Sequence, residues 1–115
     1  MFPEFLPKLT ENLTETTSVA LSKNIDRKPI QTPLISQPIT TTFVRQGNGG
    51  IPILLLHGFD SSLLEYRRIF PLLAANNETI AVDLLGFGFT ERLPGLKISP
   101  QTISSHLYCF WKTAI

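Results

Sequence analysis

The chain has 115 residues and a formal net charge of +1, with 43% hydrophobic and 17% charged residues. This length allows one small domain and excludes two, and the composition is ordinary for a globular protein. No block of like charge favours nucleic acid, and no apolar run approaches the roughly 20 residues of a membrane span. A lone cysteine, Cys109, excludes an internal disulfide. Since the N-terminus also lacks the pattern of a secretion signal, we expect a cytoplasmic protein.

Residues 1–31 are interpreted as a leader with one or two helical turns. Its apolar residues recur at a loose helical spacing, at Leu6, Leu9, Leu13, Val19, Leu21 and Ile25. They lie among Thr and Ser, which are indifferent helix formers, so any helix should be short. A helix packed back on the domain, or a half-ordered leader, is favoured over a helix that binds a partner or a membrane surface.

Residues 32–45 carry β-branched and aromatic residues between prolines and Gly47, a pattern that predicts two short strands. The glycine-rich segment 47–50 predicts a tight hairpin turn, because no helix follows it as a phosphate-binding loop would require. Residues 32–115 are therefore assigned to one domain that opens with an N-terminal hairpin.

The strongest strand signal is the run from Ile53 to Leu56, which is continuous rather than alternating. Such a run is typical of a strand buried on both faces of a parallel sheet. A helix should follow, with Ser62 as N-cap and Glu65 completing a capping box. Pro71 should kink or split that helix. The expected buried face consists of Leu63, Tyr66, Phe70 and Leu73.

A second buried strand is predicted at residues 79–82, directly before Asp83. A last helix should begin with Ser99 as N-cap and Pro100 at its first position. Its apolar stripe is expected to consist of Ile103, Leu107, Phe110 and Ala114. The order strand, helix, strand with apolar strands indicates an α/β fold with a mostly parallel sheet.

Two loops directly follow the buried strands, and the carboxyl ends of parallel strands are where such sheets bind ligands. The first begins HGFD at residues 57–60, and the second reads DLLGFGFT at residues 83–90. Together they resemble the α/β-hydrolase family: the first is similar to its oxyanion loop, and the second to its Asp-x-x-Gly-x-Gly-x-Ser segment, with Thr90 replacing the usual serine. The resemblance covers residues 33–115 and implies an incomplete α/β-hydrolase sheet, with the first strands and two helices.

The resemblance also implies roles for these residues. The Phe59 backbone N–H would stabilise the oxyanion formed when an acyl carbonyl is attacked, and one such donor contributes roughly 3–4 kcal/mol. Gly58 would let the backbone approach closely, while His57 and Asp60 would support the loop. The structural residues of the second turn would be Asp83, Gly86 and Gly88. No metal and no cofactor is implied.

The family's nucleophile lies on a Gly-x-Ser-x-Gly elbow after the next strand. None of the serines, at positions 18, 22, 36, 61, 62, 99, 104 and 105, has that setting. We therefore expect an N-terminal segment of a serine-type ester or acyl hydrolase, inactive alone because it lacks nucleophile, acid and base. Only the full-length relative would act on a small-molecule substrate. The alternative is a truncated, non-catalytic product or a remnant that binds a partner, or itself, through an open sheet edge.

Three further residues have competing interpretations. Some α/β-hydrolases use an aspartate nucleophile, and Asp60 lies between a strand and a helix, but the preceding His-Gly favours the oxyanion loop. His106, at the edge of the last helix's apolar stripe, is expected to be structural, and Cys109 should be a small buried residue. The spacing of His57, Asp60 and His106 is not that of metal ligands.

Overall fold

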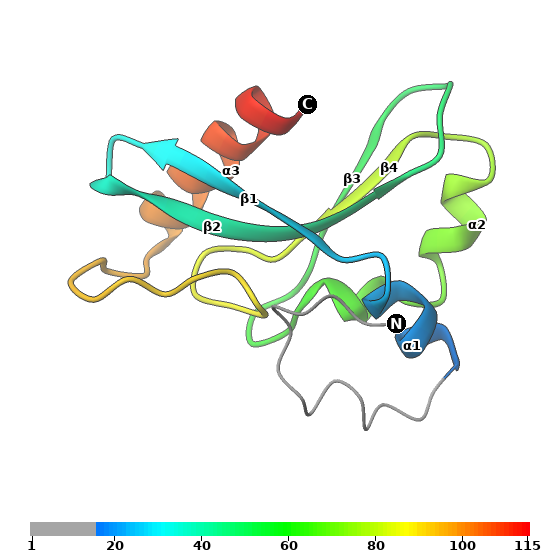
Figure 1. Cartoon of the computed structure of the whole chain (residues 1–115), viewed down its shortest axis with the longest axis horizontal. Helices are drawn as coiled ribbons and strands as arrows, with labels where there is room; N and C mark the ends of the chain where they lie inside the picture. The colour runs from blue at the N-terminus through cyan, green and yellow to red at the C-terminus, as the bar shows by residue number, and fades with distance from the viewer. Residues whose placement is uncertain (1–15) are drawn as a thin grey trace.

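The computed structural model describes residues 16–115, with side chains described from Val19 onward. In chain order the elements are α1 (Thr16–Ser22), β1 (Asp26–Thr32), β2 (Ile35–Gln46), β3 (Ile53–Leu56), the short 3₁₀ helix η2 (Leu63–Tyr66), α2 (Phe70–Ala74), β4 (Thr79–Val82) and α3 (Pro100–Ala114). Figure 1 shows the strands in the middle of the molecule, with α3 on one side and α1 and α2 on the other.

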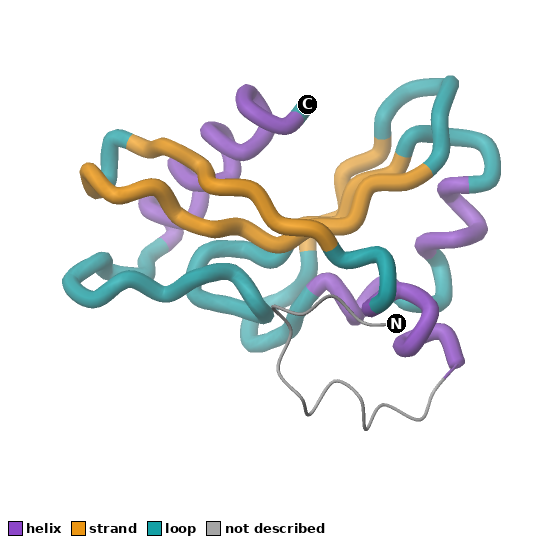
Figure 2. Tube along the Cα trace, viewed as in Figure 1, coloured by secondary structure: helices purple, strands orange, loops and turns teal. Residues whose placement is uncertain are grey.

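The four strands form one sheet in the order β1-β2-β4-β3, which can be followed in Figure 2. β3 and β4 pair in parallel, whereas β1–β2 and β2–β4 are antiparallel. The predicted α/β sheet with an N-terminal hairpin is therefore present, although parallel pairing is confined to β3 and β4. The crossover between these two strands carries η2 and α2.

Alternate side chains of each strand point to opposite faces of the sheet, and helices cover both faces. On one face a buried cluster joins the sheet to α1, η2 and α2; it consists of Leu21, Ile25, Val44, Leu63, Phe70 and Ala81. On the other face a second cluster joins the sheet to α3; it consists of Ile30, Ile80, Val82, Cys109 and Phe110. All four residues of β4 are buried, as predicted, because this strand has neighbours on both edges and helices on both faces.

The N-terminal part of the sheet differs from the sequence prediction. A single long strand, β2, replaces the two short strands expected in residues 32–45, and it pairs with β1. β1 lies mostly in the segment assigned to the leader, so the proposed boundary at residue 31 falls inside this strand. The sequence of β1 gives only a weak strand signal, since Ile30 is its only strongly apolar buried side chain and Pro29 is tolerated only on an edge strand.

The expected leader helix is represented by α1 within the described residues. Leu21 and Ile25 are each 4% exposed and pack into the core beneath η2 and α2. This part of the leader thus packs back on the domain. The other apolar positions of the predicted helix, up to residue 13, lie outside the described residues.

The glycine-rich segment 47–50 is not the hairpin turn that we predicted. β2 and β3 do not pair with each other, because β4 lies between them. The segment instead passes close to the connection between α2 and β4, where a Cβ at Gly47 would overlap the backbone oxygens of Ala74 and Asn77. The local sequence pattern of two consecutive strands joined by a short glycine loop does not distinguish strands that pair from strands that lie on either side of a third.

β3 is less buried than its apolar run predicted. Its first three residues are half-buried, and Leu56 is 42% exposed. In the part of the chain that the structure describes, no strand pairs with the outer side of β3. The run therefore has the composition of a central strand but the position of an edge strand.

The helix predicted after β3 is split, as the position of Pro71 indicated. Ser62 caps η2, with its Oγ accepting from the Leu64 N–H at 3.2 Å, and α2 starts separately with Pro71 in its first turn. The predicted capping box is wrong, because the Glu65 carboxylate accepts from the Gly58 N–H instead. Of the expected buried face, Leu63 and Phe70 are fully buried, and Tyr66 and Leu73 are half-buried.

α3 begins as predicted, with Ser99 as its N-cap and Pro100 as its first residue. Its buried face is rotated from the expected stripe, since the fully buried residues are His106, Cys109 and Phe110. None of the helices described between residues 16 and 115 is long and apolar enough to cross a membrane.

Candidate oxyanion-loop site

The two predicted loops start side by side at one end of the sheet. β3 and β4 are parallel and in register, with Leu56 opposite Val82, so His57 and Asp83 follow at the same rim. His57, which is 5% exposed, connects the loops: its Nε2 lies 3.0 Å from the Leu84 backbone nitrogen. Its ring also makes an edge-on contact with Phe87, at 5.7 Å between ring centroids.

The contacts of His57 define its tautomer. A backbone N–H can only donate, so Nε2 must accept from Leu84, and the ring proton must reside on Nδ1. Nδ1 lies 2.8 Å from the Gly58 carbonyl oxygen, to which it donates. His57 is thus a neutral side chain that receives a hydrogen bond from the second loop and gives one to the first.

Phe59 follows at the tip of the first loop. Within residues 16–115 its backbone N–H makes no hydrogen bond, and this N–H belongs to the same peptide group as the carbonyl held by His57. The Phe59 side chain is 90% exposed and contacts Phe87 edge-on at 5.3 Å. The rim therefore presents the Phe59 backbone donor beside the rings of Phe59 and Phe87.

Gly58 is held by Glu65, which was expected to complete a capping box on its own helix. Its N–H donates to Glu65 Oε1 at 3.0 Å, and this hydrogen bond, followed by one from the Ser61 side chain, lowers the pKa of Glu65. A Cβ at Gly58 would meet only Glu65 Oε1, at an ordinary 3.7 Å, and its φ is not in the left-handed region. The chain's own packing does not require glycine here, so its expected role in close approach of a substrate stays a prediction.

Asp60 is exposed and adopts a left-handed conformation, with φ of 58°, which aspartate tolerates better than most residues. An aspartate nucleophile would need a histidine to activate the water that releases its ester. Both ring nitrogens of His57 are already engaged, and His106 is bonded to Thr41. In the described structure neither histidine contacts Asp60.

Asp83 is fully buried and organises the second loop. Its Oδ1 accepts from the Leu63 N–H at 2.7 Å, and its Oδ2 accepts from the Phe89 N–H at 2.8 Å and from Thr42 Oγ1 at 2.6 Å. One carboxylate therefore joins η2, β2 and the turn. Thr42 has no local signal in the sequence, since it lies 41 positions before its partner.

The glycines of this turn lie where their backbone conformation requires them. Gly86 and Gly88 both have positive φ, 87° and 58°. A Cβ at Gly88 would overlap the Asp83 carboxylate. Thr90, in place of the family's serine, keeps the hydroxyl's function: it donates to the Asp83 carbonyl at 2.8 Å and accepts from the Thr42 N–H at 3.2 Å.

His106 and Cys109 lie on the buried face of α3, away from the rim. Thr41 Oγ1 donates to the Ile39 carbonyl, so His106 Nε2–H must donate to Thr41, at 2.7 Å. The other ring nitrogen, Nδ1, is buried and has no partner among residues 16–115, and burial lowers the pKa of His106 to about 4. Cys109 is 8% exposed. Among residues 16–115 no three acidic, histidine or cysteine side chains are grouped as metal ligands would be.

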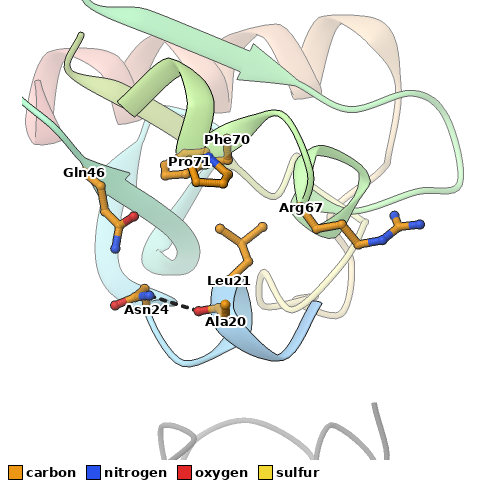
Figure 3. A pocket seen from close by; sticks show the side chains of 7 residues that line it. All are labelled: Ala20, Leu21, Asn24, Gln46, Arg67, Phe70 and Pro71. Carbon is orange, nitrogen blue, oxygen red and sulfur yellow. Dashed lines mark hydrogen bonds between the residues drawn. The ribbon is translucent and has the colours of Figure 1, made fainter. Parts of the chain in front are cut away.

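A half-open pocket of about 90 Å³ lies between α1 and α2 (Figure 3). It is lined by Ala20, Leu21, Asn24, Gln46, Arg67, Phe70 and Pro71. None of these belongs to the two rim loops. The pocket is therefore separate from the two rim loops. Inside it the Asn24 amide donates to the Ala20 carbonyl at 2.9 Å.

Comparisons with known proteins agree with this geometry. No family model matches the chain. An α/β-hydrolase domain-containing protein of Arabidopsis thaliana, VTE7, is 38% identical over 122 residues, which cover 99% of this chain and 36% of the relative.

Solved structures give the same result. A thermophilic esterase from Thermogutta terrifontis is similar with a TM-score of 0.69 and 26% identity, over 77% of this chain and 32% of the esterase. The Cif epoxide hydrolase of Acinetobacter nosocomialis is similar with a TM-score of 0.63 and 25% identity, over 80% of this chain and 28% of that enzyme. The chain thus spans about a third of the length of these proteins. These similarities and the two rim motifs agree: the chain belongs to the α/β-hydrolase fold family, and its sheet is an incomplete form of that fold.

Proposed function

We propose that these residues supply the oxyanion loop of a hydrolase that cleaves esters or related acyl substrates, with the Phe59 N–H as donor. The observation that supports this most is that two neighbouring backbone N–H groups differ in their hydrogen bonding. The Gly58 N–H is bonded to Glu65, whereas the Phe59 N–H has no acceptor within the described residues and lies at the rim where parallel sheets bind ligands.

The chemistry follows from charge development. Attack on an acyl carbonyl places negative charge on its oxygen, and a backbone donor already aimed at that oxygen stabilises the transition state without reorganisation. The hydrogen bond from His57 Nδ1 to the Gly58 carbonyl polarises the peptide that carries the Phe59 N–H and makes it a stronger donor.

We assign the covalent step to groups outside these residues. No serine of the chain lies on a Gly-x-Ser-x-Gly elbow. His57 has no ring nitrogen available as a base, since one accepts from Leu84 and the other donates to Gly58. The 115-residue chain alone should therefore hydrolyse p-nitrophenyl esters no faster than buffer.

A chimera tests the donor. Residues 26–115 would replace the equivalent segment of the Thermogutta esterase, and p-nitrophenyl ester hydrolysis would be measured. Phe59→Pro deletes the N–H and should lower kcat by about 10²–10³-fold, as loss of an oxyanion donor does elsewhere. Phe59→Ala keeps the N–H and should retain most of the activity. A folded chimera in which both variants have equal kcat would refute the proposal.

The open edge of β3 supports a second candidate, a binding role. Leu56 is 42% exposed, and unpaired edges with apolar side chains pair readily with other strands. We expect the purified chain to self-associate in size-exclusion chromatography, and Leu56→Lys to shift it toward monomer. A monomeric wild-type chain at high concentration would refute the use of this edge.

A further inference from the structure

The Glu65 side chain does not cap its own helix, η2. Its backbone N–H donates to the Ser62 carbonyl at 3.0 Å, and the Ser62 hydroxyl alone provides the side-chain cap, bonding to Leu64. The Glu65 carboxylate instead reaches back seven positions to the Gly58 N–H, and the Ser61 side chain donates to it as well. A carboxylate on η2 is therefore tied to the tip of the neighbouring loop.

This bond makes Gly58 a residue held from both sides. Its N–H donates to Glu65 Oε1 at 3.0 Å, and its carbonyl accepts from His57 Nδ1 at 2.8 Å. Glycine is the residue with the least intrinsic backbone restraint, so without these two bonds the peptide leading to Phe59 could rotate. The hydrogen bonds thus fix the two peptide planes on either side of Gly58.

Each of the two side chains has a separate anchor on the rigid part of the domain. His57 is held by the Leu84 N–H of the second loop. Glu65 is carried by η2, whose first residue, Leu63, is fully buried and donates its N–H to the Asp83 carboxylate. The orientation of Phe59 is therefore linked to both loops and, through Asp83, to the sheet.

We propose that Glu65 is a positioning residue for the oxyanion loop: by holding the Gly58 amide it fixes the direction of the Phe59 N–H before a substrate arrives. The idea rests on the proposed function. Preorganisation of this kind matters because a donor that must reorient during the reaction loses much of its electrostatic benefit.

The surroundings keep the Glu65 carboxylate ionised at neutral pH. The Gly58 hydrogen bond, followed by the one from Ser61, lowers its pKa. Tyr66, the next residue, responds in the opposite sense: burial and then the Glu65 charge raise its pKa. Glu65 therefore offers the Gly58 N–H a charged acceptor.

The test uses the ¹⁵N-labelled 115-residue chain at pH 7, so that it does not depend on activity. Backbone order parameters and amide–water exchange rates would be measured by NMR for the wild type, Glu65→Ala and Glu65→Gln. Glu91→Ala is the matched control, because the Glu91 carboxylate also accepts a backbone N–H, that of Thr40, but outside this loop.

The expected wild-type order parameter of Phe59 is near the rigid value of about 0.85, and Glu65→Ala should lower it toward the flexible range below about 0.6. Exchange of the Gly58 amide should become several-fold faster. Glu65→Gln keeps an acceptor oxygen and should give intermediate values, which a merely structural loss would not. Glu91→Ala should leave both quantities unchanged.

Unchanged order of Phe59 in Glu65→Ala would overturn the proposal, as would an equal loss of order in Glu91→Ala. The chimera variants separate this result from the proposed function. Loss of activity in Phe59→Pro with unchanged order in Glu65→Ala would leave the oxyanion role standing and refute the positioning role. The reverse pattern would refute the oxyanion role and leave Glu65 as a loop restraint.

Discussion

Acid should destabilise this domain through His106, and the sign follows from its burial. His106 is 1% exposed, its Nε2–H donates to Thr41, and Nδ1 has no partner in the described part of the chain. Burial lowers the pKa of the folded-state imidazole from 6.5 to about 4. Between these values the unfolded chain binds a proton that the folded chain does not, so stability must fall as the pH falls through this window.

The size of the effect follows from the two pKa values. Linkage gives a loss of about 2 kcal/mol in the free energy of unfolding between pH 7 and pH 5, from this one group. Below pH 4 the folded state is protonated too, and the loss levels off. For a small domain, with a total stability of roughly 5–15 kcal/mol, this is a large fraction.

Urea unfolding followed by far-UV circular dichroism at pH 7, 6 and 5 measures this loss. The matched variant is His106→Gln, whose amide can still donate to Thr41 but does not titrate. The wild type should lose about 2 kcal/mol more than the variant over this range. Equal losses in the two proteins would refute the argument that a neutral, buried His106 is required by the fold.

Two further predictions concern the second loop. Asp83→Ala leaves buried donors of three segments without an acceptor and should lower the free energy of unfolding by about 3–5 kcal/mol in urea titrations; a loss below about 1 kcal/mol would contradict its central role. Gly88→Ala should cost more than the roughly 1–2 kcal/mol of a left-handed alanine, because its Cβ would also overlap Asp83. Gly95→Ala has a similar positive φ but open space around it, so equal midpoint shifts for the two variants would argue against the overlap.

Several elements were predictable because their signals are local. The apolar run at residues 53–56, the loop motif at its end and the Ser99 cap of α3 are each encoded within a few consecutive residues. The order of two buried strands with a helical crossover indicated parallel pairing. That pairing was enough to place His57 and Asp83 at one rim.

β1 was missed because its signal is not local. Its sequence is mostly polar, and it becomes a strand only because β2 offers a paired edge. The glycine segment at 47–50 was misinterpreted for a related reason. β2 and β3 are separated by β4, whose first residue, Thr79, pairs with Gln46 although it lies 33 positions later in the chain.

The site shows the same division between local and distant information. The apolar strands before them were enough to predict that His57 and Asp83 lie at one rim, whereas the donor role of the Phe59 N–H stays a prediction. What holds these residues depends on the folded chain: Glu65 bonds to Gly58 rather than to its own helix, and Thr42 reaches Asp83 from β2. A side chain's hydrogen-bond partner is the nearest unsatisfied group in space, and folding, rather than sequence spacing, sets that distance.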